Sequence, residues 1–194
     1  MAVCNWNEIM PETAMFMAAC AQRGDTMVMT IKGRPVDYAR NNAVRLFLKN
    51  KVFTHLFFID SDISSTIDTI DKLLALEAPL ASGCCNVVGG KGLVWACLNK
   101  DKSGVYHLLN DLPDNQKPFY CDGSGAGCLL IRRDVFDKIA WPWFQWIERE
   151  NGTQMSEDVY FCQKANNAGL RVRFDPKVHC DHFKIVNLKT LQRK

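Results

Sequence analysis

The chain has 194 residues, of which 47% are hydrophobic and 23% are charged, with a formal net charge of +3. These values predict a single folded domain, residues 1–194, with an ample core. The mild, scattered positive charge gives no reason to expect a nucleic-acid partner. There is no apolar run of membrane-spanning length and no signal peptide at residues 1–8, so we expect a soluble, cytoplasmic protein without a transmembrane segment.

The nine cysteines are an odd number and form no Cys-x-x-Cys pair. This argues against a secreted disulfide framework and favours reduced thiols. Cys84, Cys85, Cys128 and Cys162 stand among apolar residues, so we expect them to be small buried hydrophobes.

Strands and helices alternate over the first half of the chain. The predicted strands are 2–6, 27–31, 55–60 and 79–85, and the predicted helices are 12–22, 36–49 and 66–77. This alternation predicts a doubly wound α/β fold with a mostly parallel central sheet.

The middle of the chain, residues 86–121, is rich in glycine and in turn residues. Its short candidate strands at 94–98 and 105–108 predict a small antiparallel addition over the active face. The later predicted elements are strand 127–132, helix 133–139, helix 157–168 and strand 171–174. Ser156 is a good N-cap for the last helix and Gly169 a good stop.

The most informative stretch is the apolar run Leu56 to Ile59, which leads directly into Asp60 and Asp62. A short apolar run bounded by polar residues predicts a buried strand. The two carboxylates then lie at its carboxyl end, where open α/β sheets bind ligands. Paired carboxylates suit a divalent cation and, through it, a diphosphate. The spacing alone is expected about once by chance, so its context must carry the claim.

Further polar patterns accompany this acidic pair: Ala39-Arg40-Asn41, Gly123 to Gly127, Ser156-Glu157-Asp158, and His179 to His182. Acidic residues in the first turn of a helix are ordinary, because they complement the helix dipole. The glycine-rich segment precedes a strand rather than a helix, so it is no dinucleotide fingerprint.

Taken in this order, the patterns resemble the GT-A glycosyltransferases, especially the compact family 2-like enzymes. The resemblance extends from about Arg34 to Lys184. It implies a GT-A, Rossmann-like sheet flanked by helices. It also implies transfer of a sugar from a nucleoside-diphosphate donor to a hydroxyl acceptor on a glycan, a lipid or a protein glycan. UDP is the favoured donor nucleotide.

The resemblance also implies a cofactor, Mn²⁺ or Mg²⁺, with Asp60, Asp62 and His182 as its ligands. His179 is the competing histidine. Asp60, Ser61 and Asp62 are further implied to contact the donor nucleotide. The cation would neutralise the diphosphate leaving group as the sugar–phosphate bond breaks.

The catalytic residues implied by the resemblance are Asp158 and its neighbour Glu157. Asp158 would deprotonate the acceptor hydroxyl of an inverting reaction. Arg40 and Asn41 are implied to lie near the nucleotide or its diphosphate. The alternative for Arg40 is an ordinary solvated helix face.

An aromatic cluster follows the predicted helix 133–139, at Trp141, Trp143, Phe144 and Trp146. In the family this region borders the acceptor site, and aromatic rings stack on the C–H faces of sugars. Aromatic residues are more often core, so we expect one of the four to reach a ligand.

Three other readings remain open from the sequence. Asp60 and Asp62 also resemble the first motif of the haloacid dehalogenase-like phosphatases, where Asp60 would be the nucleophile and Mg²⁺ is required. That motif normally lies on the first strand, however. The chain could also be a non-catalytic nucleotide-sugar-binding module. Finally, His179, Cys180 and His182 could bind zinc, although no second cysteine pair supports such a site.

Overall fold

The computed structural model describes residues 1–5, 8–89, 92–148, 150 and 152–186. Its helices are α1 (Pro11–Ala21), α2 (Val36–Lys49), α3 (Thr69–Leu74), α4 (Val135–Lys138) and α5 (Glu157–Asn167). Its strands are β1 (Ala2–Asn5), β2 (Met29–Lys32), β3 (His55–Asp60), β4 (Ile63–Ser65), β5 (Leu80–Gly89), β6 (Gly92–Lys100), β7 (Tyr106–Leu109), β8 (Phe119–Cys121), β9 (Gly123–Ser124), β10 (Cys128–Arg132), β11 (Ile147–Glu148), β12 (Gln154–Met155) and β13 (Val172–His182). Trp6, the end of the predicted first strand, lies outside the described residues.

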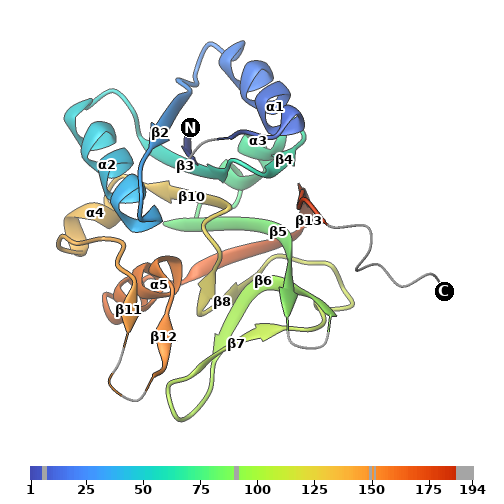
Figure 1. Ribbon diagram of the computed structural model, residues 1–194, viewed down its shortest axis with the longest axis vertical. Coiled ribbons are helices and arrows are strands. Elements are labelled where there is room, and N and C mark those ends of the chain that lie inside the picture. Colours follow the sequence, from blue (N-terminus) through green and yellow to red (C-terminus); the bar gives the residue numbers. More distant parts are fainter. Residues whose placement is uncertain (6–7, 90–91, 149, 151, 187–194) are drawn as a thin grey trace.

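The main sheet has the order β2-β1-β3-β10-β5-β13-β4 (Figure 1). β1 pairs in parallel with β2 and β3, and β5 pairs in parallel with β13. β10 is antiparallel to both β3 and β5, which therefore point the same way. The predicted alternation of the first half is confirmed, but the sheet is mixed rather than uniformly parallel. β9 pairs with β6 in the antiparallel region, at the edge of the main sheet where its parallel strands end. The chain therefore enters β10 from this carboxyl edge, and β10 runs opposite to the parallel strands.

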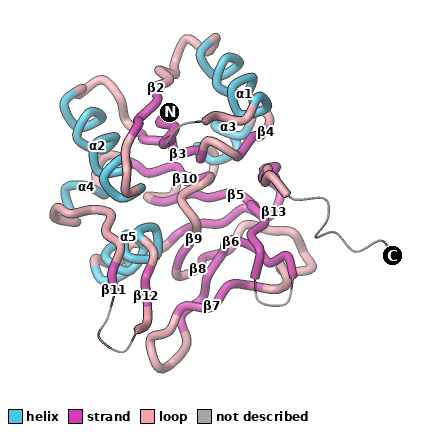
Figure 2. Tube along the Cα trace, in the orientation of Figure 1, coloured by secondary structure: helices cyan, strands magenta, loops and turns pink. Residues whose placement is uncertain are grey.

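Helices cover both faces of this sheet (Figures 1 and 2). α2, α4 and α5 contribute buried side chains to one core, and α1 and α3 contribute to the other. β3 serves both cores, because Leu56 and Phe58 face the first and Phe57 and Ile59 face the second. The prediction of a strand buried on both faces is thus confirmed. Asp60, the last residue of β3, therefore lies at the edge of the sheet where this strand ends.

The predicted antiparallel addition is present in residues 86–121. β6 pairs with β7, with β9 and with Asn86 to Gly89 at the carboxyl end of β5. β5 is longer than the predicted strand 79–85 because this carboxyl end leaves the main sheet to form the pairing with β6.

The last strand is also much longer than predicted. The sequence indicates an end at Phe174, since Asp175 and Pro176 are typical of a turn. Instead β13 pairs with β5 up to Asp175, passes through an irregularity, and pairs again from His179 onward. Proline is tolerated at such a bulge, where no ladder hydrogen bond is needed from its nitrogen. This extension carries His182 to the carboxyl edge of the sheet.

The nine cysteines are all free and buried, as expected for Cys84, Cys85, Cys128 and Cys162. Within the described part of the chain, no helix is both long enough and apolar enough to cross a bilayer.

Candidate active site at the carboxyl edge of the sheet

Arg40 lies at the centre of a buried ion network. Its Nε donates to Glu157 Oε1 at 2.9 Å and its Nη2 donates to Asp60 Oδ1 at 2.9 Å. The side chains of Arg40 and Glu157 are only 3% and 6% exposed. The guanidinium also lies over the ring of Phe58, 5.4 Å from its centroid. Arg40 therefore joins the end of β3 to the start of α5 and is not on a solvated helix face.

The electrostatics of this network follow from burial and pairing. Burial works against the charge of Arg40, but the carboxylates of Asp60 and Glu157 outweigh it and raise the pKa of the guanidinium. Burial raises the pKa of Glu157, and the charge of Arg40 opposes that change. Arg40 Nη1 is buried and has no hydrogen-bond partner among the described residues. The buried charges of Arg40 and Glu157 thus compensate each other.

A second group forms around Asp62, two residues further along the chain. Its Oδ2 lies 3.3 Å from His182 Nε2 and accepts a hydrogen bond from Lys184 Nζ. His182 Nδ1 lies 2.6 Å from the carbonyl oxygen of Asn86. A carbonyl can only accept, so Nδ1 carries a proton; Nε2 also carries one and donates to Asp62 in the imidazolium form, and it is free to bind a metal in the neutral form. Anchoring one ring nitrogen on a backbone carbonyl is how proteins orient a histidine whose other nitrogen binds a metal.

Both members of this pair have shifted pKa values. Burial opposes ionisation of Asp62, but hydrogen bonds from His182 and Lys184 outweigh it and hold its pKa at about 2. The hydrogen bond to Asp62 raises the pKa of His182. At neutral pH, Asp62 is therefore a carboxylate.

The structure brings together two of the three expected metal ligands. Asp62 and His182 are in contact, whereas Asp60 is turned to Arg40. Among the residues that the structure describes, no three His, Cys, Asp or Glu side chains are grouped to hold a metal ion. The carboxylate nonetheless suits Mn²⁺ or Mg²⁺, which take further ligands from water and substrate phosphates, and the imidazole favours the transition-metal ion Mn²⁺ over Mg²⁺.

The choice between the two late histidines follows from the period of β13. His179 is exposed, and its backbone carbonyl accepts a hydrogen bond from Ser65. Cys180 is buried and faces Cys85 on the neighbouring strand. His179, Cys180 and His182 therefore do not converge, and the alternative zinc site is not formed in the described part of the chain.

Asp158 lies in the first turn of α5. Its Oδ1 accepts hydrogen bonds from the Ser156 hydroxyl and from the backbone N–H of Val159. A Cβ atom at Gly125 would stand 3.7 Å from the other oxygen, Oδ2. One carboxylate oxygen is thus held by the helix start, and the other faces the glycine-rich segment.

The same glycine-rich segment also touches Asp60. The carbonyl of Gly127 accepts the backbone N–H of Asp60 at 3.3 Å. A Cβ atom at Gly127 would lie 3.1 Å from Asp60 Oδ2 and 2.3 Å from Ile63 Cδ1. A side chain at this position would force Ile63 to move, so glycine favours the close packing of the segment against Asp60 and Ile63.

A cavity of about 350 Å³ opens beside these acids. Its lining residues come from the ends of β1 and β2, the start of α2 and the turn after β3: Cys4, Asn5, Gly33, Arg34, Pro35, Val36, Ala39 and Ser61. Asn5 Oδ1 is buried and has no hydrogen-bond partner among the described residues. A bound molecule with an N–H or O–H group could satisfy that oxygen.

Asn41 is placed differently from the other predicted site residues. Its Nδ2 donates to the carbonyl of Phe144 at 2.7 Å, and its Oδ1 accepts the backbone N–H groups of Trp143 and Phe144. The side chain holds the aromatic segment against α2 and does not join the acidic cluster. Its expected contact with a nucleotide stays a prediction.

Sequence reasoning missed Lys184 as a partner of Asp62. The signal was present, because residues two apart on an extended strand lie on one side, and Lys184 is two residues beyond His182. It was hidden because the predicted last strand ended at Phe174.

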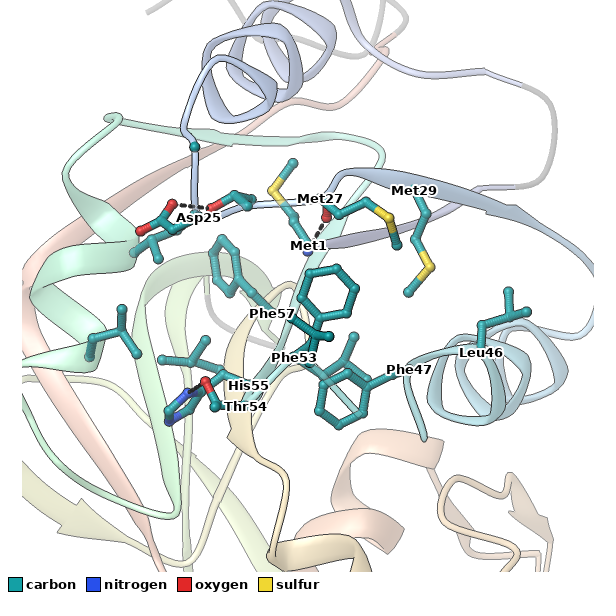
Figure 3. Close-up of a pocket in the computed structure, with 17 residues that line it drawn as sticks. Met1, Asp25, Met27, Met29, Leu46, Phe47, Phe53, Thr54, His55 and Phe57 are labelled. Carbon is teal, nitrogen blue, oxygen red and sulfur yellow. Dashed lines mark hydrogen bonds between the residues drawn. The ribbon is translucent and has the colours of Figure 1, made fainter. Parts of the chain in front are cut away.

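A larger cavity, of about 510 Å³, lies at the opposite, amino-terminal edge of the sheet (Figure 3). Phe47, Phe53, Met27 and Met29 surround it, and most other lining residues are apolar. None of the predicted site residues lines this cavity.

No protein-family model matches the chain, and no curated protein does. The solved structures that share its fold include two that cover most of this chain. A197 from STIV is 16% identical with a TM-score of 0.66, over 95% of this chain and 84% of that one. GalNAc-T7, solved with UDP, GalNAc and Mn²⁺, is 14% identical with a TM-score of 0.64, over 93% of this chain and 43% of that one. GalNAc-T7 is a GT-A glycosyltransferase, and at these identities the likeness shows a GT-A-like fold alone.

Proposed function

We propose that this chain is a metal-dependent glycosyltransferase that uses a nucleoside-diphosphate sugar, with UDP as the favoured nucleotide. The observation that carries the proposal is one convergence at the carboxyl edge of the sheet. There the carbonyl of Gly127 accepts the backbone N–H of Asp60, Asp158 Oδ2 faces the position of Gly125, and Asp62 with His182 lies at the same edge. The fold shared with GalNAc-T7 supports the proposal at the level of architecture.

In this proposal, Asp62 and His182 hold Mn²⁺ or Mg²⁺. The ion would offset negative charge on the diphosphate as the sugar–phosphate bond breaks. Two protein ligands are enough for such a site, because these ions keep several waters and bind substrate phosphates directly. Lys184 shares Asp62 Oδ2 and so competes with the cation for that carboxylate.

The nucleoside is proposed to occupy the cavity of about 350 Å³ that includes Asn5 and Ser61. This volume is in the range of small-molecule sites. Asn5 Oδ1, which has no hydrogen-bond partner among the described residues, can accept a hydrogen bond from a base N–H, which uracil possesses. Ser61 connects the cavity to Asp60 and Asp62.

The proposed base is Asp158. Its Oδ2 would take the proton of the acceptor hydroxyl, and the acceptor oxygen would form a bond to the anomeric carbon. The bond from that carbon to the diphosphate oxygen would break, and its electron pair would leave with the diphosphate. This is an inverting reaction. The acceptor is a hydroxyl of a glycan, a lipid or a protein glycan.

Arg40 and Glu157 are proposed as positioning residues. The buried pair fixes Asp60 on β3 relative to the start of α5, where Asp158 lies. A phosphatase would instead need Asp60 as a free nucleophile. Its Oδ1 is bound by Arg40, so no observation favours that alternative.

The test is release of nucleoside diphosphate from a panel of UDP- and GDP-sugars with Mn²⁺, with and without simple sugar acceptors. Asp158→Asn should lower turnover about 10²–10⁴-fold and leave donor binding unchanged. Asp137→Asn, at an exposed acid in the first turn of α4, is the matched control and should keep full activity. Unchanged turnover in Asp158→Asn, or release of inorganic phosphate alone, would contradict the proposal.

A further inference from the structure

Three buried cysteines meet in the core of the main sheet. The thiols of Cys85 on β5, Cys128 on β10 and Cys180 on β13 hydrogen-bond to one another. All three side chains belong to the core to which α1 and α3 contribute. They come from three neighbouring strands, and the proposed reaction uses none of them.

Cys85 and Cys180 are direct partners in the parallel pairing of β5 with β13. Neighbouring strands lie about 4.8 Å apart, and both side chains are on the same face of the sheet. A disulfide needs Cα atoms that are about 4.4–6.8 Å apart. The backbone spacing of this pair therefore suits a disulfide.

Cys128 contacts both thiols but is placed less well for such a bond. β5 lies between β10 and β13, so two strand spacings, about 9–10 Å, separate the Cα atoms of Cys128 and Cys180. Leu129 pairs with Ser82 in the antiparallel ladder, so Cys128 is a diagonal neighbour of Cys85. Diagonal neighbours are about 7–8 Å apart, beyond the usual limit of a disulfide.

The position of Cys180 gives an oxidant its route to the pair. Cys180 is 8% exposed, compared with 4% for Cys85 and 1% for Cys128. It pairs with Ser65 on β4, a strand of three residues at the end of the main sheet. Short edge strands open locally at low cost, because few backbone hydrogen bonds hold them. Opening of β4 therefore increases access to the Cys180 sulfur first.

We infer that Cys85 and Cys180 form a reversible disulfide when a hydroperoxide oxidises the protein. The Cys180 sulfur first attacks a peroxide oxygen, the O–O bond breaks, and the leaving oxygen takes up the thiol proton. With hydrogen peroxide, this step yields the Cys180 sulfenic acid and one water. The Cys85 sulfur then bonds to the Cys180 sulfur, the S–O bond breaks, and the hydroxyl leaves with the second thiol proton as water. The two thiols lose two electrons in total, and these reduce the peroxide.

The bond would form beside the histidine of the candidate site. Asn86 follows Cys85, and its carbonyl lies 2.6 Å from His182 Nδ1. His182 is two residues beyond Cys180, so each strand that forms this contact carries one end of the disulfide. Oxidation should therefore change the surroundings of the His182 ring. The oxidation itself needs neither the proposed metal nor the donor, and so the inference stands apart from the proposed function.

Two other roles of the cluster fit less well. Three thiolates could bind a soft metal ion, but in the described part of the chain no three His, Cys, Asp or Glu side chains are grouped to hold one. Packing alone would make all contacting thiols equivalent. The hydrogen-bonded thiols of Cys97 and Cys121 provide that comparison, because both are fully buried and lie on β6 and β8, which are not paired with each other in the described sheet. We expect this second pair to stay reduced.

The direct test is oxidation of the full chain by hydrogen peroxide with EDTA present. Peptide mapping should find a Cys85–Cys180 crosslink, and two of the nine thiols should become unreactive toward iodoacetamide after unfolding. Dithiothreitol should restore both thiols. The ring resonances of His182 should shift on oxidation and return on reduction, whereas those of His55 on β3 and His107 on β7 should stay in place.

Variants then identify the sulfur atoms. Cys180→Ser and Cys85→Ser should each abolish the crosslink, and in Cys85→Ser dimedone should trap the Cys180 sulfenic acid. Cys128→Ser should keep the crosslink. The matched control is Cys84→Ser. Cys84 adjoins Cys85 but faces the opposite core, so the crosslink should form normally in that variant.

Three results would overturn the inference. They are the absence of a Cys85–Cys180 crosslink after peroxide treatment, a crosslink between Cys97 and Cys121 in its place, or His182 resonances that the crosslink leaves unchanged. These readouts use the unmodified protein, so a variant that fails to fold cannot hide the outcome. Loss of nucleotide binding, in contrast, would bear on the proposed function alone.

Discussion

The two edges of the sheet differ in cavity volume and in the polar groups that surround each cavity. The amino-terminal edge has the larger cavity, about 510 Å³, with a mostly apolar lining. The carboxyl edge has a cavity of about 350 Å³, but beside it lie the buried Arg40 network and the pair of Asp62 and His182. The volume of a cavity alone is therefore a poor indicator of a functional site. Convergent polar groups that the fold holds at a cost in desolvation identify a site more reliably.

The difference follows from strand direction. β1, β3, β5 and β13 end at the same edge, so residues that follow them in sequence meet there. Asn5, Asp60 and His182 come from three of these strand ends. The opposite edge receives the starts of these strands, the turns that precede them and the end of the antiparallel β10, and most side chains around its cavity are apolar.

The largest expected effect on stability comes from breaking the buried network at the carboxyl edge. Arg40→Ala leaves Glu157 buried without its partner, which should cost about 3–5 kcal/mol of unfolding free energy. Adding Glu157→Gln should recover part of this loss, because the orphaned charge is removed. Chemical denaturation of the three proteins measures both values. Full stability of Arg40→Ala would show that the network does not hold this edge together.

A smaller effect on stability is expected from adding a methyl group where the glycine-rich segment packs closely against its neighbours. In Gly127→Ala, the new methyl group meets Ile63 and Asp60, and the resulting strain should cost about 1–3 kcal/mol. Gly125→Ala is the milder partner, since its nearest neighbour, Ala96 Cβ, would be 3.2 Å away. Thermal unfolding should rank Gly127→Ala below Gly125→Ala. The reverse order would contradict the placement of Gly127 against Asp60.

The pair of Asp62 and His182 makes the carboxyl edge sensitive to pH. The pKa of Asp62 is lowered to about 2, so its contribution is present above the ordinary range near pH 4 and lost as pH falls toward 2. The pKa of His182 is raised, so its contribution is present below about pH 6.5 and lost as pH rises through the raised value.

The two contributions overlap between about pH 4 and 6.5, where the pair stabilises the fold most. Asp62→Asn should therefore cost about 2 kcal/mol in this window and much less at pH 2. Urea unfolding of both proteins at pH 2, 5 and 8 measures the profile. Asp137→Asn is the control and should show no such window. A cost for Asp62→Asn that is equal at pH 2 and pH 5 would exclude the pair as its source.

The smallest effect is expected at the amino-terminal edge. Met27 and Val52 line the larger cavity and are 50% and 82% exposed. Met27→Ser and Val52→Ser should change stability by no more than about 0.5 kcal/mol and leave donor binding and turnover unchanged. Activity assays of the two variants provide the check. Lost donor binding in either would show that the larger cavity takes part in the reaction.

Much of the architecture could be predicted because local pattern and fold agree. In the helix at 36–49 and in the strand ending at Asp60, most of the apolar residues stand at positions that the fold buries. The direction of β10 could not be predicted, since it depends on where the preceding β9 is paired. The length of β13 was hidden by Pro176, a turn signal that a bulge accommodates.

The site was predicted in part for the same reason. The family resemblance implies Asp62 and His182 together, and the structure brings them into contact, while their role as metal ligands stays a prediction. The ion pair between Arg40 and Asp60 joins two different elements, and no local sequence pattern predicts it. Asn41 is adjacent to Arg40 on the same predicted helix, and both were expected near the nucleotide. Its side chain instead contacts the aromatic segment, because adjacent positions of a helix face different neighbours. The single-domain prediction and the cytoplasmic location stay predictions.

The central claim is a nucleotide site that requires a metal at the carboxyl edge. The most direct test is thermal unfolding with Mn²⁺ and UDP, together and separately, with GDP for comparison. Ligand at a hundred times its dissociation constant should add about 2.7 kcal/mol, which raises the midpoint by roughly 5–10 °C for a chain of this size. We expect this shift with UDP and Mn²⁺ together, and its loss in Asp62→Ala. No shift with any nucleotide, or the same shift in Asp62→Ala, would contradict the account.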